Sequence, residues 1–186
     1  MATTKSFKKQ KLLNIKKILK DAGIEAKMKI ADLGCGRRGS FSIQAAKMVG
    51  KNGKIFAIDV LKQALKNVQS KANLFNISNI QFIWADLEIE KSTKIPDNEI
   101  DIVLIANTLY QTKKPEKILK QGKRILKKNG KILVIDWQST DTPFGPPVEK
   151  RIKIKKIKSL AKNLSLKLIQ EFEAGPYHYG LLYKKN

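Results

Sequence analysis

Residues 29–39 read Lys-Ile-Ala-Asp-Leu-Gly-Cys-Gly-Arg-Arg-Gly, a short apolar run that passes into a turn rich in glycine. The apolar run predicts a buried β-strand, and Gly34, Gly36 and Gly39 predict a tight turn, because glycine adopts positive φ and lets a ligand approach the backbone. Residues 40–49 then predict a helix, whose first N–H groups face a bound ligand. The stretch therefore predicts a strand–turn–helix unit built to hold a ligand.

A second apolar run, residues 55–58, ends on Asp59, which lies 23 residues past Gly36. In nucleotide-binding βαβ units an acid about 20 residues past the glycine turn accepts hydrogen bonds from a ribose. Asp32, two residues before the first glycine, would repel a pyrophosphate but could pair with an ammonium group. The pattern predicts an adenosine-containing cofactor, and Asp32 favours a cationic one over a dinucleotide.

The motifs Asp32-Leu-Gly-Cys-Gly36 and Ala57-Ile-Asp59 resemble the first two motifs of class I S-adenosylmethionine-dependent methyltransferases. That family usually continues G-x-G-x-G, whereas Arg38 stands here at the third glycine and Gly39 follows it. Whether Arg37 or Arg38 meets the methionine end of the cofactor stays open. The resemblance implies S-adenosylmethionine as cofactor and methyl transfer as reaction; the alternative is a glycine turn in another α/β protein.

The rest of the chain alternates strand and helix patterns, and its last segments show two strand patterns in succession. We expect strands at 28–33, 55–58, 80–85, 101–106 and 131–136, and helices at 8–21, 40–49, 61–75, 115–127 and 148–162. The last two strands, 166–173 and 178–183, are separated by only four residues, so they form an antiparallel hairpin. Five alternations and one hairpin resemble the methyltransferase fold, an α/β Rossmann-like three-layer sandwich with a mostly parallel seven-stranded sheet in the order 3-2-1-4-5-7-6.

The domain organisation that we expect is a single methyltransferase domain over residues 1–186, which is the length that one core readily supports. Within it, 1–27 is an N-terminal helix, 28–137 is the cofactor-binding core, and 138–186 is an acceptor-side loop, helix and hairpin.

The resemblance also assigns roles to the residues that end successive strands. Asp32 orients the methionine ammonium, Asp59 accepts from the ribose hydroxyls and Asp86 accepts from the adenine amino group. Leu87 lies against the adenine ring, and the cofactor-binding set is completed by Gly34 and Gly36. A lone acid at a strand end is often only a turn or cap residue, but three at matching places are harder to explain in that way.

The acceptor side is less specific. The family places residues beside the transferring methyl group at Asn107, after strand four, but the Asn/Asp-Pro-Pro-aromatic motif of amino-group methyltransferases is absent. His178, the only histidine, lies at the hairpin turn; a lone histidine is more often structural, yet its ordinary pKa suits a general base. We expect residues 137–147 and 177–179 to converge as a small-molecule pocket, unless they only pack the hairpin against the last helix.

Charge raises a nucleic-acid alternative. The chain carries 38 Lys and Arg against 16 Asp and Glu, a net charge of +22 with a pI near 10.0. Only four of these residues are arginine, the side chain suited to bidentate phosphate contacts, so we expect weak non-specific nucleic-acid binding at most. An RNA methyltransferase, or a basic nucleic-acid-binding protein that keeps the fold without turnover, remains as an alternative.

The cysteine count and the hydropathy pattern argue against disulfide-rich, thiolate-metal and membrane-spanning proteins. Cys35 is the only cysteine, so no disulfide framework, thiolate metal cluster or multi-cysteine arsenite chemistry is expected, and a reducing, cytoplasmic setting fits. No apolar run approaches the roughly 20 residues that span a bilayer. The sequence predicts no metal site and leaves monomer and homodimer both open.

Overall fold

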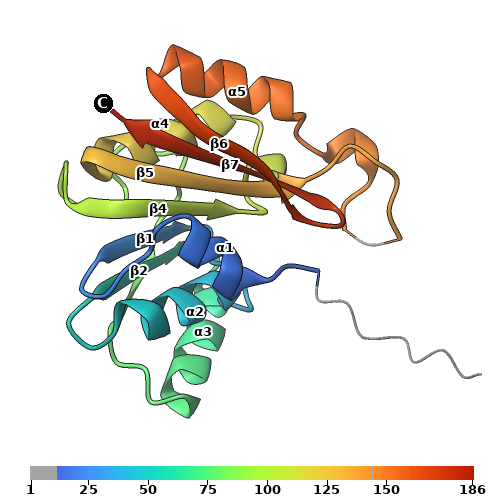
Figure 1. The fold of residues 1–186 in the computed structure, drawn as a ribbon. Coiled ribbons are helices and arrows are strands. Elements are labelled where there is room, and N and C mark those ends of the chain that lie inside the picture. The colour runs from blue at the N-terminus through green and yellow to red at the C-terminus, as the bar shows by residue number, and fades with distance from the viewer. Residues whose placement is uncertain (1–11, 144) are drawn as a thin grey trace, which may run out of the picture.

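The protein is described from a computed structural model over residues 12–143 and 145–186 (Figure 1). Its seven strands form one sheet in the order β3-β2-β1-β4-β5-β7-β6. The strands are β1 Lys29–Leu33, β2 Lys54–Asp59, β3 Ile80–Trp84, β4 Ile100–Ala106, β5 Leu126–Trp137, β6 Leu166–Gly175 and β7 His178–Lys185. The helices are α1 Ile15–Asp21, α2 Ser40–Val49, α3 Lys62–Leu74, α4 Pro115–Ile125 and α5 Ile154–Asn163, with 3-10 turns η1 Leu109–Gln111 and η2 Val148–Lys150.

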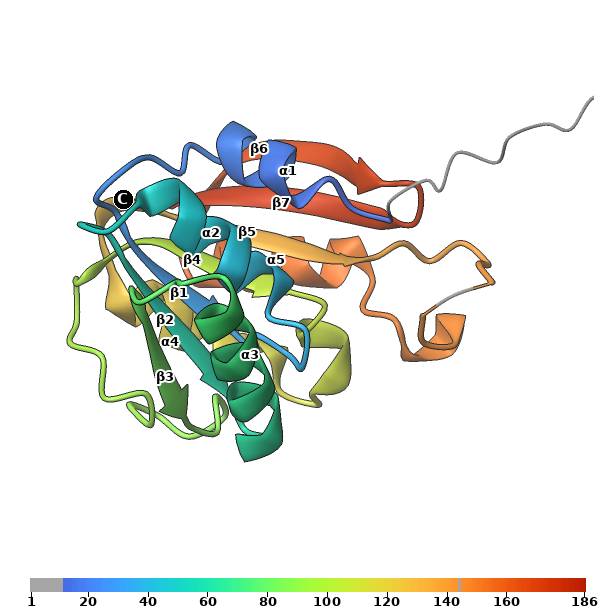
Figure 2. The same cartoon turned by 90° about the horizontal axis from the view of Figure 1, so that it is seen from below.

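Helices cover both faces of the sheet, as Figures 1 and 2 show from two directions. Alternate residues of a strand point to opposite faces, and the two cores follow this rule. Ile30 packs with residues of α1 and α2, whereas its neighbour Ala31 packs with residues of α4 and α5. The central strands are therefore buried on both sides, which explains their nearly continuous apolar runs.

Strand direction decides where a ligand can bind. Strands β1 to β5 are parallel, whereas β7 runs antiparallel to β5 and β6 antiparallel to β7. The predicted strand order and the predicted hairpin are thus confirmed. Trp137, the last residue of β5, pairs with His178, the first of β7. The hairpin turn consequently lies at the same edge as the carboxyl ends of the parallel strands, where open α/β sheets bind ligands.

The first helix is shorter than predicted. It begins at Ile15, because the Asn14 side chain accepts a hydrogen bond from the Lys17 N–H and caps the helix there. Residues 12–14 are not helical, and residues 8–11 of the predicted helix lie outside the described part of the chain. Leu12 instead runs beside the hairpin, where a Cβ added to Gly175 would lie 2.1 Å from its carbonyl oxygen.

The prediction of a helix over residues 148–162 was wrong at its start. Only the short turn η2 forms at 148–150, and α5 begins at Ile154. The cause is Arg151, whose buried guanidinium donates to the carbonyl oxygens of Pro146, Gln138 and Thr140 at 2.6–2.9 Å. These bonds fix the chain around Arg151 in an extended path that a helix could not follow.

The other element predictions are close to the structure. Helix α4 ends at Ile125 instead of 127, and β5 begins at Leu126 instead of 131. The Asn129-Gly130 turn signal falls within β5, where Asn129 has a φ of 65° and the register with β4 shifts. None of the helices in the described residues has the length and hydropathy that crossing a bilayer requires.

Candidate active site

The glycine turn after β1 is held against its neighbours by its own backbone. The N–H groups of Gly34 and Cys35 both donate to the Ile58 carbonyl at 2.9 Å. Gly34 has a φ of 86°, and a Cβ there would lie 2.5 Å from the Thr108 side chain. Gly36 has a φ of 64° and nothing within 4 Å of a Cβ position, so its backbone borders open space. The first glycine serves packing, and the second leaves room for a ligand.

Asp59 ties the end of β2 to this turn. Its carboxylate accepts from the Gly36 N–H and from the Leu61 N–H, both at 2.9 Å. The residue is 8% exposed. Each carboxylate oxygen accepts one of these two hydrogen bonds and has a second lone pair, so the carboxylate can accept further hydrogen bonds from a ligand.

Asp32 lies beneath the turn and lines neither of the two cavities described below. It is 1% exposed and accepts a 2.5 Å hydrogen bond from the Ser42 hydroxyl. Burial raises the pKa of Asp32 to about 6, the Ser42 bonds act in the opposite direction, and the Asp59 charge adds to the rise. A buried carboxylate of this kind gains from a nearby cation.

A cleft of about 460 Å³, here called the Asp59 cleft, runs along the ends of β1, β2 and β3. Its lining includes Gly34, Gly36, Arg37, Asp59, Asp86 and Leu87. Asp86 is exposed, and its carboxylate accepts from the Glu88 N–H at 2.8 Å. Leu87 is 8% exposed and supplies an apolar wall. Five of the six predicted cofactor residues thus lie around one cleft, and Asp32 lies behind it.

A second cavity of about 540 Å³, here called the Trp137 cavity, lies at the carboxyl ends of β4 and β5 and at the start of β7. Its lining includes Leu13, Arg38, Phe41, Asn107, Trp137 and His178. The Asp59 cleft and the Trp137 cavity share Gly34, Gly36, Arg37 and Gln111. The two spaces therefore meet at the glycine turn.

Two predicted residues bring unsatisfied polar atoms to the Trp137 cavity. The Asn107 Oδ1 and both ring nitrogens of His178 are buried and have no hydrogen-bond partner among the described residues. Asn107 has a φ of 54°, a strained conformation of the kind that gathers at functional sites. Buried polar atoms left without partners cost stability, so these positions suit a ligand that supplies the missing bonds.

His178 is held neutral. It is 1% exposed, and its ring centroid lies 4.1 Å from that of Trp137. Burial, together with the positive charge of Arg151, lowers the pKa of His178 to about 4. At neutral pH the imidazole therefore offers one N–H donor and one free lone pair.

The two segments expected to converge do meet, because the Gln138 N–H donates to the Tyr177 carbonyl at 2.9 Å, but their side chains divide between two hollows. Trp137 and His178 line the Trp137 cavity, whereas Tyr179 borders a separate hollow with Gln138 and Thr140. The Tyr179 hydroxyl donates to the Ile152 carbonyl at 3.0 Å, which ties the hairpin to the segment before α5. His178 and Tyr179 are neighbours in β7 and face opposite sides of the sheet, so these two side chains do not line the same hollow. Residue 144 lies outside the described part of the chain.

Sequence reasoning missed Asp136. This residue is fully buried, its Oδ1 accepts from the Trp137 N–H at 2.9 Å, and its Oδ2 has no partner among the described residues. Burial raises the pKa of Asp136 to about 7, while nearby backbone N–H groups act against the rise. Its position as an acid at the end of a predicted strand, like Asp59, was the available signal.

Comparison with known proteins agrees with this geometry. The methyltransferase domain family matches residues 24–178. A ubiquinone/menaquinone biosynthesis C-methyltransferase, UbiE, of Escherichia fergusonii is 28% identical over 130 residues, which are 69% of this chain and 49% of the relative. The chain thus spans about half the length of the curated relatives it matches.

Solved structures show the same fold. A SAM-dependent methyltransferase from Aquifex aeolicus superposes with a TM-score of 0.86 at 27% identity, covering 94% of this chain and 91% of that one. An arsenic(III) S-adenosylmethionine methyltransferase from Chlamydomonas reinhardtii gives a TM-score of 0.69 at 19% identity, covering 87% of this chain and 64% of that one, and supports the fold alone.

Proposed function

Because the chain belongs to the family of class I S-adenosylmethionine-dependent methyltransferases, we propose that it transfers the methyl group of S-adenosylmethionine to a small-molecule acceptor. The observation that carries the proposal is the junction of the Asp59 cleft and the Trp137 cavity at the glycine turn. Transfer between two ligands needs two adjoining spaces whose contents meet at one point.

The cofactor fits the Asp59 cleft by the chemistry of its lining. Asp59 accepts from the ribose hydroxyls, Asp86 accepts from the adenine amino group, and Leu87 covers the adenine ring. Gly36 supports this assignment, because no atom lies within 4 Å of the place where a Cβ would be. Asp32 acts from behind the glycine turn, where its buried carboxylate favours the cationic end of the cofactor.

The Trp137 cavity holds the acceptor. S-adenosylmethionine supplies an electrophilic methyl group on a sulfonium centre. Residues of this chain position the acceptor and exclude water: Trp137 and Phe41 provide apolar walls, and Asn107 accepts a hydrogen bond from the acceptor. His178, neutral at physiological pH, takes the acceptor's proton through its free ring nitrogen as the new bond to the methyl group forms, although its lowered pKa makes it a weaker base than an ordinary imidazole.

A small-molecule acceptor is supported by the matched relative, whose name describes a quinone-biosynthesis C-methyltransferase. The lining of the cavity is mostly apolar, which is more typical of small-molecule binding than of RNA binding, since RNA-binding grooves are basic and stack bases on aromatic side chains. We also propose that residues 1–186 form one methyltransferase domain and that it works in the cytoplasm, a setting that suits the one cysteine of the sequence.

The proposal is tested by calorimetric titration with S-adenosylhomocysteine, the demethylated product, and separately with NADH. We expect saturable one-to-one binding of S-adenosylhomocysteine and none of NADH. Tight NADH binding without S-adenosylhomocysteine binding would return the glycine turn to the dinucleotide interpretation. Mass spectrometry of the natively purified protein then looks for retained cofactor, and a screen with unlabelled S-adenosylmethionine identifies acceptors whose mass rises by that of one CH₂ group.

A further inference from the structure

Arginine is used sparingly in this chain. Among 38 basic residues only Arg37, Arg38, Arg124 and Arg151 are arginine. Lysine and arginine carry the same charge, but arginine presents a planar fork that pairs with two oxygens of an anion or of the backbone. The contacts of each arginine therefore show whether the chain uses the fork at that place.

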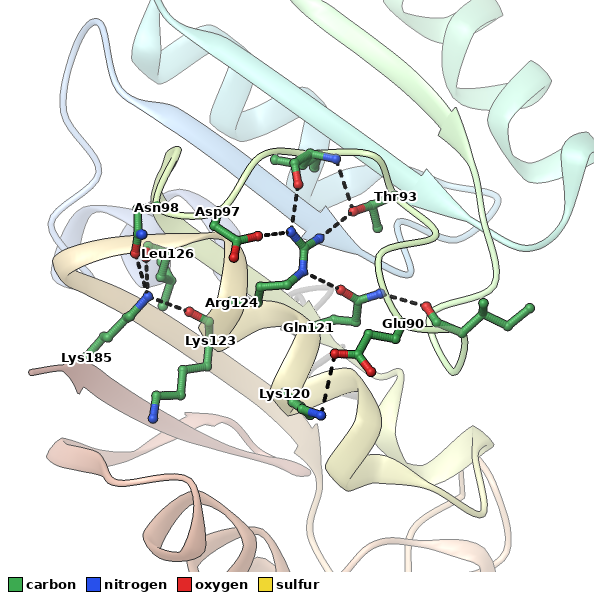
Figure 3. Close-up of polar contacts among 12 residues, drawn as sticks. Glu90, Thr93, Asp97, Asn98, Lys120, Gln121, Lys123, Arg124, Leu126 and Lys185 are labelled. Carbon is green, nitrogen blue, oxygen red and sulfur yellow. Dashed lines mark hydrogen bonds and ion pairs between the residues drawn. The ribbon is translucent and has the colours of Figure 1, made fainter.

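Two of the four arginines hold segments of the protein together. The Arg124 guanidinium contacts Asp97, the Ile95 carbonyl, Gln121 and Thr93, and this network joins α4 to the loop before β4 (Figure 3). Arg151 is 7% exposed and donates to three backbone carbonyls and to Thr142. Both forks are satisfied within the protein.

Arg37 and Arg38 have no such partners. Neither guanidinium makes a hydrogen bond or an ion pair with any residue in 12–143 or 145–186, and both residues are exposed. They are the central residues of a turn that the Gly39 N–H closes on the Gly36 carbonyl at 3.2 Å. This turn places Arg37 between the two spaces of the site, and Arg38 on the Trp137 cavity alone.

Charge is divided between the two spaces. The described lining of the Asp59 cleft includes three acids, Asp59, Asp86 and Glu88, against Arg37. The described lining of the Trp137 cavity includes no acid, and it carries Arg37 and Arg38 beside a neutral His178. An adenosine with hydroxyl and amino donors suits the first space, whereas the second attracts negative charge.

We propose that the acceptor is an amphipathic anion, whose carboxylate or phosphate group is bound by the forks of Arg38 and Arg37 while its apolar part fills the cavity beside Trp137. This inference rests on the proposed function, which assigns the Trp137 cavity to the acceptor. It adds the charge of the substrate, and it gives Arg38, at the place where the family has a glycine, a role in specificity.

The test uses probes of matched shape on protein saturated with S-adenosylhomocysteine. 2-Naphthoate, 2-naphthyl phosphate and the uncharged 2-naphthalenemethanol are titrated by calorimetry at equal ionic strength. We expect at least one anion to bind about tenfold more tightly than the alcohol, which is the effect of one lost charge-assisted contact. The ratio of the two anions shows whether a carboxylate or a phosphate suits the forks better.

Arg38→Gln then locates the contact. We expect roughly tenfold weaker binding of the preferred anion, with less than about twofold change for the alcohol and for S-adenosylhomocysteine. Lys155→Gln on α5 removes one exposed charge that lines neither the Asp59 cleft nor the Trp137 cavity, and it should change none of the three affinities by more than about twofold.

Two results overturn the inference without touching the proposed function. One is equal binding of anions and alcohol by a protein that binds S-adenosylhomocysteine normally. The other is an Arg38→Gln variant that loses S-adenosylhomocysteine affinity but keeps its preference for the anion, because the arginine then serves the cofactor's own carboxylate. Absence of S-adenosylhomocysteine binding in the wild-type protein overturns the proposed function itself.

Discussion

Substitution Asp59→Ala separates two roles that one carboxylate combines in this protein. In the unliganded structure Asp59 fastens the glycine turn through the Gly36 and Leu61 N–H groups, each at 2.9 Å. In the proposed complex the same carboxylate also binds the ribose. The first role affects stability and the second affects cofactor affinity, so the variant should change both.

The expected magnitudes follow from these contacts. A hydrogen bond to a charged group contributes about 1.5–3 kcal/mol, and water in the cleft can replace part of each lost bond. We therefore expect a loss of about 3 kcal/mol for the two backbone bonds together, which lowers the Tm of a chain of this size by roughly 6–12 °C. Losing the ribose bond weakens cofactor binding by a further 1.5–3 kcal/mol, roughly 10- to 150-fold.

Asp101→Ala is the matched control. Asp101 accepts from the Lys29 N–H at 2.8 Å and from Lys127 Nζ at 2.6 Å, but it lies at the opposite end of the sheet from Asp59. Thermal unfolding by circular dichroism gives the Tm of each variant, and calorimetric titration with S-adenosylhomocysteine at a temperature where both are folded gives the Kd. We expect similar losses of Tm and a weaker Kd for Asp59→Ala alone.

The refuting result is specific. If Asp59→Ala and Asp101→Ala lose similar stability and both bind S-adenosylhomocysteine like the wild type, the carboxylate of Asp59 only fastens the turn. The ribose assignment is then wrong, although the fold and the family are not affected.

Three further predictions concern pH, catalysis and the basic surface. Because burial raises the pKa of Asp32 to about 6, the carboxyl becomes neutral as pH falls from 7 to 5, and S-adenosylmethionine should bind roughly tenfold more weakly at pH 5; titrations of Asp32→Asn should show no such slope. His178→Phe removes two unsatisfied buried nitrogens at similar size, so the Tm should stay or rise and the cofactor Kd should stay, while turnover on an identified acceptor falls about 10²–10⁴-fold; normal turnover would contradict a proton-transfer role. Helix α5 carries four lysines and no acid, so we expect weak RNA binding at low salt that nearly vanishes at physiological salt; tight binding there, measured by fluorescence anisotropy, would favour the RNA alternative.

The raised pKa of Asp32 also has a consequence for stability. Its value in the folded protein, about 6, lies above the ordinary 3.8, so the folded state holds the proton more tightly than the unfolded state. The associated stability is fully present below pH 4 and is lost as the pH rises through 6. A bound cation near Asp32 would offset this loss, because it favours the charged carboxylate.

Local sequence determined much of the cofactor side. Strand, glycine turn and helix follow from apolar runs, glycines and helical periodicity, which act over a few residues. The acids Asp59 and Asp86 follow apolar runs in the sequence. They come to the same edge of the sheet because parallel strands present their carboxyl ends along one edge. The short link before His178 allowed only a hairpin. These features could therefore be predicted from neighbouring residues and from the parallel sheet that the strand pattern implies.

Tertiary structure decided the acceptor side. The start of α5 depends on the Arg151 fork, which gathers carbonyls from residues up to 13 positions away, and no helical periodicity reports that contact. The division of Trp137 and His178 from Tyr179 depends on the strand register, since a shift of one residue would exchange the faces. Burial, not residue type, leaves the nitrogens of His178 without partners and lowers its pKa. Such properties arise from packing between segments far apart in sequence, and only the folded chain brings those segments together.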